Sequence, residues 1–235
     1  EITHLLADES GNRLTISDQK ITVNPAGTIS VDTANLLGLT TTGVVTATIT
    51  GTETVGELAT LNADGGTNKL SITIRSDDAT AATATQLNTI NSATATAVNL
   101  TNVTGLAASS LSDLTDLATA INAGQFSNAT GLTTIAVSDT TIDATSLADR
   151  IDSYDSINGG STTGMTLAAG ATINVDADEI THMLLDETQN RLTIGDQKIT
   201  VTNAITVDQA NLLGATTSGV VTATIAGTET VTELA

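Results

Sequence analysis

The sequence predicts an α/β protein, a right-handed parallel solenoid whose strand–helix repeats of about 30 residues extend it into an elongated rod. Three observations lead to this prediction. A long segment occurs twice, turn motifs recur along all 235 residues, and each interval holds an alternating apolar stretch before a helical pattern. We therefore expect residues 1–235 to form a single repeat array.

The duplicated segment covers residues 1–58 and 179–235. EITHLLADESGNRLTISDQKITV, from residue 1, returns as EITHMLLDETQNRLTIGDQKITV from Glu179, and VVTATITGTETV at 44–55 returns as VVTATIAGTETV at 220–231. An active site is needed once, so near-identical copies indicate geometry rather than chemistry. Because the sequence starts and stops inside equivalent copies, we expect either further repeats in the full chain or end-to-end association.

Shorter repeats lie within this long period. Each is marked by a turn motif just before an apolar strand start, and the spacing falls in the range typical of solenoids. The motifs are Asn12-Arg13-Leu14, Thr42-Gly43-Val44, Asn68-Lys69-Leu70, Thr130-Gly131-Leu132, Thr163-Gly164-Met165, Asn190-Arg191-Leu192 and Ser218-Gly219-Val220. With a weaker boundary at Val98, the repeats are predicted to start near residues 14, 44, 70, 98, 132, 165, 192 and 220.

Each repeat begins with period-two alternation, which predicts a strand. The first strands are typified by Leu70, Ile72 and Ile74, and second strands are predicted at Ile21 and Val23, at Ile142, and at Ile173 and Val175.

A polar cap and a helical pattern follow the strands. Asp32, Asp143 and Asp176 are the predicted caps, and Asp176 has capping-box spacing to Glu179. The longest predicted helix carries an apolar stripe from Leu111 to Ile121 and stops near Gly124.

Strands and helices that alternate in constant order run their strands in one direction, and the crossovers between parallel strands are right-handed. Short helices rich in Ala, Ser and Thr, as in DATAATATQLNTI, allow close approach of neighbouring repeats. A string of small sandwich domains is the competing architecture, but it requires antiparallel turns every 8 to 12 residues and few helices.

The composition excludes several classes of protein. Asp and Glu outnumber Lys and Arg by 26 to 7, and a net charge of −19 argues against nucleic-acid and anionic-membrane partners. There is no Cys, which excludes disulfides and thiolate metal sites. No apolar run approaches the roughly 20 residues of a membrane span. Aromatic residues make up 1% of the chain, so the core must consist of Val, Ile, Leu and Ala.

Several clusters resemble parts of known sites, but we predict no catalytic, cofactor-binding or metal site from them. Glu-x-x-His with a later Asp occurs at Glu1, His4 and Asp8 and again at Glu179, His182 and Asp186, where an exposed polar helix face is expected. Asp64-Gly65-Gly66 and Ser76-Asp77-Asp78 are expected to form a turn and a helix cap, and Asp155 with Asn158-Gly159-Gly160 a loop. Calcium bound between repeats stays open as an option. Thr46 and Thr48, repeated at Thr222 and Thr224, are expected to be ordinary strand-surface residues.

The phrases GVVTATITGTETVGELATL and TATQLNTINSATATAVNLTNVTG resemble the giant acidic, cysteine-free repeat proteins of bacterial cell surfaces, of the marine cyanobacterial type. The resemblance covers essentially the whole chain and lies in the recurring pattern of a Thr/Val strand, a small-residue cap and a helical segment rather than in a single motif. It implies cell-surface, matrix or adhesive roles and no catalytic residues.

We therefore expect a non-enzymatic structural or adhesive segment of a large extracellular repeat protein that forms a stalk, fibre or matrix filament. Its expected partners are further copies or adjacent repeats end to end, and surface polysaccharide or other cells. The alternative is a binding module, such as a phage tail-fibre segment or a carbohydrate- or ice-binding solenoid. An enzyme embedded in a solenoid, such as a polysaccharide lyase, ranks third.

Overall fold

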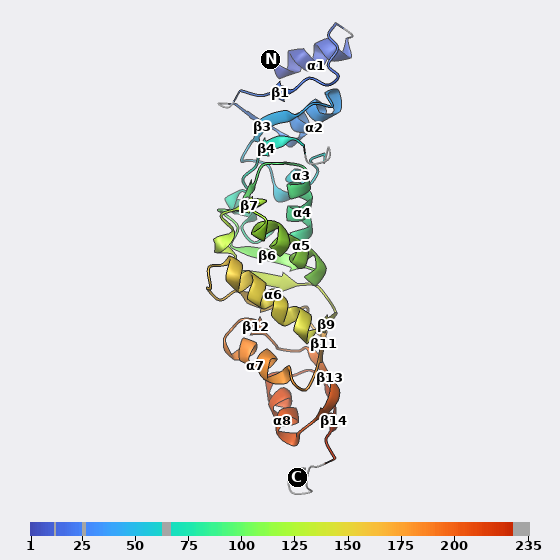
Figure 1. Cartoon of the computed structure of the whole chain (residues 1–235), viewed down its shortest axis with the longest axis vertical. Coiled ribbons are helices and arrows are strands. Elements are labelled where there is room, and N and C mark those ends of the chain that lie inside the picture. Colours follow the sequence, from blue (N-terminus) through green and yellow to red (C-terminus); the bar gives the residue numbers. More distant parts are fainter. Residues whose placement is uncertain (12, 25–26, 63–66, 228–235) are drawn as a thin grey trace. The chain divides into compact units, whose positions relative to one another are not determined.

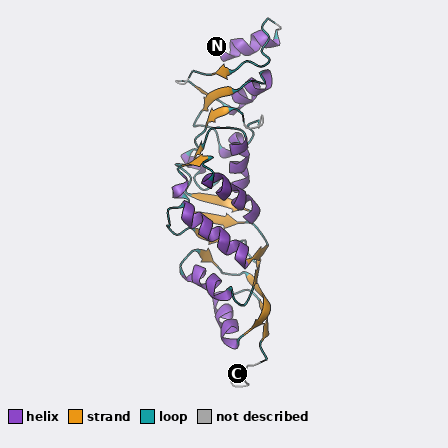
Figure 2. Ribbon diagram, in the orientation of Figure 1, coloured by secondary structure: helices purple, strands orange, loops and turns teal. Residues whose placement is uncertain are grey.

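A computed structural model describes residues 1–11, 13–24, 27–62 and 67–227, and it confirms a mixed α/β fold with parallel sheets. Short strands and helices alternate along the described chain (Figure 1 and Figure 2). The chain divides into two compact bodies. The N-terminal body comprises Glu1–Val103 and Thr119–Gly131, and the C-terminal body comprises Thr104–Ala118 and Leu132–Ala235.

The elements of the N-terminal body are α1 (Ile2–Ser10), β1 (Ile21–Thr22), β2 (Thr28–Ile29), α2 (Val31–Thr40), β3 (Val45–Ile49), α3 (Val55–Leu58), β4 (Lys69–Ser71), the 3-10 helix η1 (Ser76–Asp78), α4 (Ala84–Ser92), β5 (Val98–Asn99), β7 (Phe126–Ser127) and η2 (Ala129–Gly131). Strand β3 pairs in parallel with β1 and β2 on one side and with β4 on the other. A second, two-stranded sheet joins β5 to β7.

The elements of the C-terminal body are β6 (Gly105–Ser109), β8 (Thr134–Val137), β9 (Thr141–Asp143), α6 (Ala144–Ile157), β10 (Gly164–Thr166), β11 (Thr172–Val175), α7 (Ile180–Thr188), β12 (Leu192–Thr193), β13 (Lys198–Ile205), α8 (Val207–Thr216) and β14 (Val221–Ile225). Helix α5 (Leu111–Asn122) begins here, and its last residues belong to the N-terminal body. Two parallel sheets have the strand orders β6-β8-β10-β12 and β9-β11-β13-β14.

The register of these sheets places equivalent residues of successive repeats side by side. Met165 pairs with Ile135 on one side and with Leu192 on the other. Ile173 likewise pairs with Ile142 and Ile199. All of these side chains are buried. The predicted second strands are therefore confirmed, and their alternating apolar residues form rows across each sheet.

Side-chain caps start several of the helices. Thr54, Thr83 and Thr206 form complete capping boxes at α3, α4 and α8. Asp143 caps α6 as predicted, accepting a hydrogen bond from the Ser146 amide at 2.9 Å. The predicted helix from residue 111 is confirmed as α5.

The sequence placed two caps wrongly. Ser30, rather than Asp32, caps α2, because its hydroxyl accepts from the Thr33 amide while Asp32 lies in the first helical turn. At α7 the cap residue is Glu179, which reaches back to the Asp176 amide at 3.4 Å without a reciprocal side-chain bond. The predicted capping box there is only half formed.

The loop predicted at Asp155 is also wrong, because α6 continues to Ile157. Burial explains the longer helix: Tyr154 is fully buried, and its hydroxyl donates to the Leu114 carbonyl oxygen at 3.0 Å. The turn begins at Asn158, and Gly159 and Gly160 follow with positive φ. The strand start predicted at Leu14 does not form, and this side chain is 42% exposed.

The core consists mainly of Val, Ile, Leu and Ala, as the composition predicts, with Phe126 and Tyr154 as its buried aromatic residues. In the part of the chain that the structure describes, no helix has the length and apolar character needed to cross a bilayer.

Candidate functional site

The two Glu-x-x-His motifs lie on different helices and in different bodies, the first on α1 and the second on α7. Among the described residues, no group of three or more His, Asp or Glu side chains is arranged to hold a metal ion. Asp64-Gly65-Gly66 lies outside the described residues. Ser76-Asp77-Asp78 forms η1, and its last residue has a role described below.

Thr46 and Thr48 are half-buried on β3, and Thr22 and Thr28 are their partners on the preceding strands. On β4 their partners are Lys69 and Ser71. The outer face of this sheet is therefore a mixed polar surface, in which a lysine interrupts one of the two rows of hydroxyl groups.

The structure brings together polar groups that join one repeat to the next. Five buried residues just before a strand form what we call the turn row, consisting of Thr41, Asn68, Thr94, Thr163 and Thr217. Each bonds to the backbone of the preceding repeat. Thr41 donates to the Gln19 carbonyl at 2.6 Å, and Thr217 donates to Gln197 at 2.6 Å in the second copy.

The remaining members of the turn row follow the same rule. Thr163 donates to Leu132 at 3.2 Å, and Asn68 accepts from the Val45 amide at 2.9 Å. Thr94 accepts from the Leu70 amide at 2.9 Å. Because a buried backbone group without a partner costs about 1–3 kcal/mol, these side chains hold each strand start against the neighbouring repeat.

The turn row also explains two glycines. A Cβ atom at Gly43 would collide with the Gln19 carbonyl oxygen, and one at Gly219 would collide with Gln197. The backbone of one repeat therefore approaches the preceding repeat too closely at this turn for any side chain.

Carboxylates form a second set of links between repeats. Glu53, Asp78 and Asp139 each follow a strand, and each accepts a hydrogen bond from the first amide of the helix in the preceding repeat. These amides belong to Val31 of α2, Val55 of α3 and Leu111 of α5, at 3.2, 2.8 and 2.7 Å respectively.

Such carboxylates satisfy a free amide and carry a charge that the helix N-terminus favours. We call these three residues the cross-repeat caps. Part of the acidity of the chain therefore has a structural role.

An arginine between helices α6 and α7 provides the strongest local electrostatics. Arg191 bonds Asp186 at 2.8 Å and Asp155 at 2.7 Å, and it also bonds Asp152. Its side chain is 15% exposed, and that of Asp186 is 2% exposed. This charge cluster joins the repeat that contains α6 to the repeat that contains α7.

Burial raises the pKa of Asp186, and the nearby Asp152 and Asp155 add to the rise, while Arg191 and His182 oppose it. Desolvation by burial lowers the pKa of Arg191. The Asp152 hydrogen bond and the charges of Asp186 and Asp155 outweigh this effect, so the net shift is upward. The arginine stays charged and holds the aspartates together.

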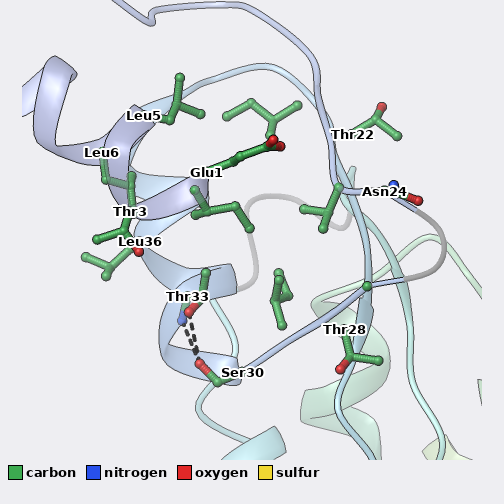
Figure 3. Close-up of a pocket in the computed structure, with 15 residues that line it drawn as sticks. Glu1, Thr3, Leu5, Leu6, Thr22, Asn24, Thr28, Ser30, Thr33 and Leu36 are labelled. Atoms are coloured by element: carbon green, nitrogen blue, oxygen red, sulfur yellow. Dashed lines mark hydrogen bonds between the residues drawn. The ribbon is translucent and has the colours of Figure 1, made fainter.

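An open groove of about 900 Å³ lies beside α1 (Figure 3). Leu5 and Leu6 of α1 and Leu36 of α2 line one side, and Thr22 and Thr28 line the strand side. Ser30 and Thr33, which are hydrogen-bonded to each other at the start of α2, also line the groove. Helix α1 itself buries no residue.

The turn motifs predicted from the sequence include Asn68 and Thr163 and adjoin Thr41 and Thr217. Thr94 and the bonds that these five residues make were not predicted. The cross-repeat caps were not predicted either, because Asp78 and its exposed neighbour Asp77 look alike in the sequence. One indication was present: Glu53 recurs as Glu229 in the second copy, at the same place after the strand.

The site that emerges is thus an interface between neighbouring repeats. No family model matches the chain, and the comparisons with curated proteins and with solved structures found no match either.

Proposed function

We propose that this chain is a structural or adhesive segment of a large extracellular repeat protein, built as a right-handed parallel α/β solenoid that forms a stalk, fibre or matrix filament. The observation that carries the proposal is the cross-repeat cap. A carboxylate of one repeat completes the helix of the repeat before it, as Asp78 does for Val55.

The repeats linked in this way depend on a neighbour for satisfied backbone groups. The turn row adds buried hydrogen bonds of the same direction, such as Thr94 to Leu70. An array joined in this way gains length with every repeat and gains stability from nearest-neighbour contacts. These properties suit a mechanical role rather than catalysis.

The extracellular location is part of the proposal. It is supported by the absence of Cys, by the net charge of −19, which opposes lateral clumping, and by the resemblance to bacterial surface proteins. The proposed partners are further repeats end to end, and polysaccharide or neighbouring cells at the surface.

Small-angle X-ray scattering with light scattering tests the architecture. A compact protein of this length has a radius of gyration of about 18 Å, and we expect a monomer with a clearly larger value. A compact monomer near 18 Å would refute the rod. An obligate trimer would favour the tail-fibre alternative. Repeating the measurement with EGTA and with excess Ca²⁺ determines whether calcium between repeats contributes to the length.

A further inference from the structure

The duplicated segments provide an internal comparison, because nearly the same sequence has different surroundings in the two copies. Residues 1–23 and 179–201 differ at only five positions. In the second copy, α7 buries Ile180, Met183 and Asp186, whereas α1 buries none of its residues. Leu192 lies in β12 and is 2% exposed, while its equivalent Leu14 is in no strand and is 42% exposed.

The surroundings of the second copy come from the repeat that precedes it. Residues 132–178 precede the second copy and contribute β10, which pairs with β12, and α6, which packs on α7. Leu147 and Ile151 of α6 line a small cavity of about 150 Å³ together with Met183 and Leu192. The Thr145 hydroxyl bonds the Glu179 carboxylate across the same contact.

The surface that meets α6 is present again on the first copy. The residues of the second copy that line this contact are Glu179, His182, Met183, Asp186 and Leu192, and their equivalents are Glu1, His4, Leu5, Asp8 and Leu14. Only the pair Leu5 and Met183 differs, and both side chains are apolar and of similar volume. In the second copy, the Glu-x-x-His motif therefore lies at a repeat interface.

The two copies also differ in the ion pairs that their equivalent arginines make. Arg191 bonds three aspartates, two of which, Asp152 and Asp155, lie on α6. Its equivalent Arg13 pairs with Asp8, and its side chain is 73% exposed. An incoming helix with two aspartates spaced three residues apart would complete this cluster around Arg13.

We propose that α1, Arg13 and Leu14 form an interface, which we call the α1 face, and that its partner is a further repeat of the type of residues 132–178. The inference rests on the proposed function but is narrower, since it names the partner and the residues that receive it. An intact second copy of this chain does not fit, because α7 already covers its own α6.

The test joins an extra copy of residues 132–178 ahead of Glu1 in the full chain. Asp178 is then followed by Glu1 as it is naturally followed by Glu179. Hydrogen exchange measured by mass spectrometry reports on α1 and on the added repeat. Burial of side chains such as Leu5 and Leu14 should slow exchange in α1 by about 10- to 100-fold, towards the rate of α7.

A matched extension carries Leu147→Asp and Ile151→Asp in the added copy only and should leave α1 at its original rate. Arg13→Met should restore faster exchange in the extended chain while changing little in the original chain. Two results overturn the proposal. One is unchanged exchange in α1 beneath a folded extension, and the other is an added repeat that exchanges without protection.

Light scattering of the original chain gives its oligomeric state and so tests whether a second copy of the chain binds the α1 face. A dimer in which α1 is protected would mean that an intact second copy binds the α1 face, which would contradict the proposed partner. Small-angle X-ray scattering of the extended chain gives its length, and this separates the inference from the proposed function. An extended chain that is longer, with α1 still unprotected, leaves the rod intact and removes only the α1 face.

Discussion

Asp78 offers the sharpest test of the cross-repeat caps. Its side chain is 11% exposed and accepts from the Val55 amide at 2.8 Å and from the Arg75 guanidinium at 3.1 Å. Arg75 also donates to the Thr52 carbonyl, so the Asp78–Val55 and Arg75–Thr52 bonds both join this repeat to the preceding one. We expect Asp78→Ala to leave the first amide of α3 buried without a partner and to release Arg75.

The expected loss of stability follows from the two bonds that Asp78 makes, one with the Val55 amide and one with the Arg75 guanidinium. A hydrogen bond to a charged acceptor contributes about 1.5–3 kcal/mol, and a partly exposed ion pair contributes up to about 1 kcal/mol. Asp78→Ala should therefore lower the free energy of unfolding of the N-terminal body by about 2–4 kcal/mol. Asp78→Asn keeps an acceptor oxygen and should cost about 1 kcal/mol.

The matched control is Asp77→Ala, which removes the same charge from the exposed adjacent residue and should change stability by less than about 0.5 kcal/mol. Urea unfolding followed by circular dichroism gives the free energies. Exchange of the Val55 amide should accelerate by about 30-fold or more in Asp78→Ala. Equal effects of the two alanine variants would refute the cross-repeat cap.

Three further predictions concern the turn row and the charge cluster. Thr94→Val keeps the shape but removes the acceptor for the Leu70 amide, and urea unfolding should show a loss of about 1–3 kcal/mol; a loss under 0.5 kcal/mol would contradict the turn row. Arg191→Met leaves three carboxylates without their cation and should cost about 3–5 kcal/mol, whereas Arg13→Met in the first copy should cost less than about 0.5 kcal/mol; equal losses would contradict the role assigned to burial. Burial raises the pKa of Asp186, so its contribution to stability is present below its unfolded value of about 3.9 and is lost as pH rises through the raised value. The stability of the wild type relative to Asp186→Asn should therefore fall as pH rises above the unfolded value, and a constant difference in urea midpoints would contradict this assignment.

The prediction of elements was most successful where local chemistry decides them. Period-two alternation around Leu70 and Ile173 located strands, and Asp143 located the start of α6. It failed where a distant group competes. Asp155 sits in a helix because Tyr154, one residue earlier, is buried and bonded to Leu114. No local pattern contains that contact, since it joins residues 40 positions apart.

The candidate site likewise has features that the sequence predicts and features that it does not. Its turn motifs were visible because Gly43 and Gly219 stand in both copies. The partners of Asp78 and Arg191 were not visible, because a hydrogen bond to a neighbouring repeat depends on how the repeats are placed in space.

The amino-acid sequence by itself determined the order of strands and helices, the parallel direction of the strands and the makeup of the core, since these follow from periodicity, capping chemistry and composition. Only the tertiary structure decided which polar groups are buried. Arg191 and Arg13 are equivalent residues of nearly identical segments, yet Arg191 belongs to a buried cluster and Arg13 is exposed. The physical reason is that burial and charge pairing depend on the neighbour that a segment meets, and identical segments meet different neighbours here.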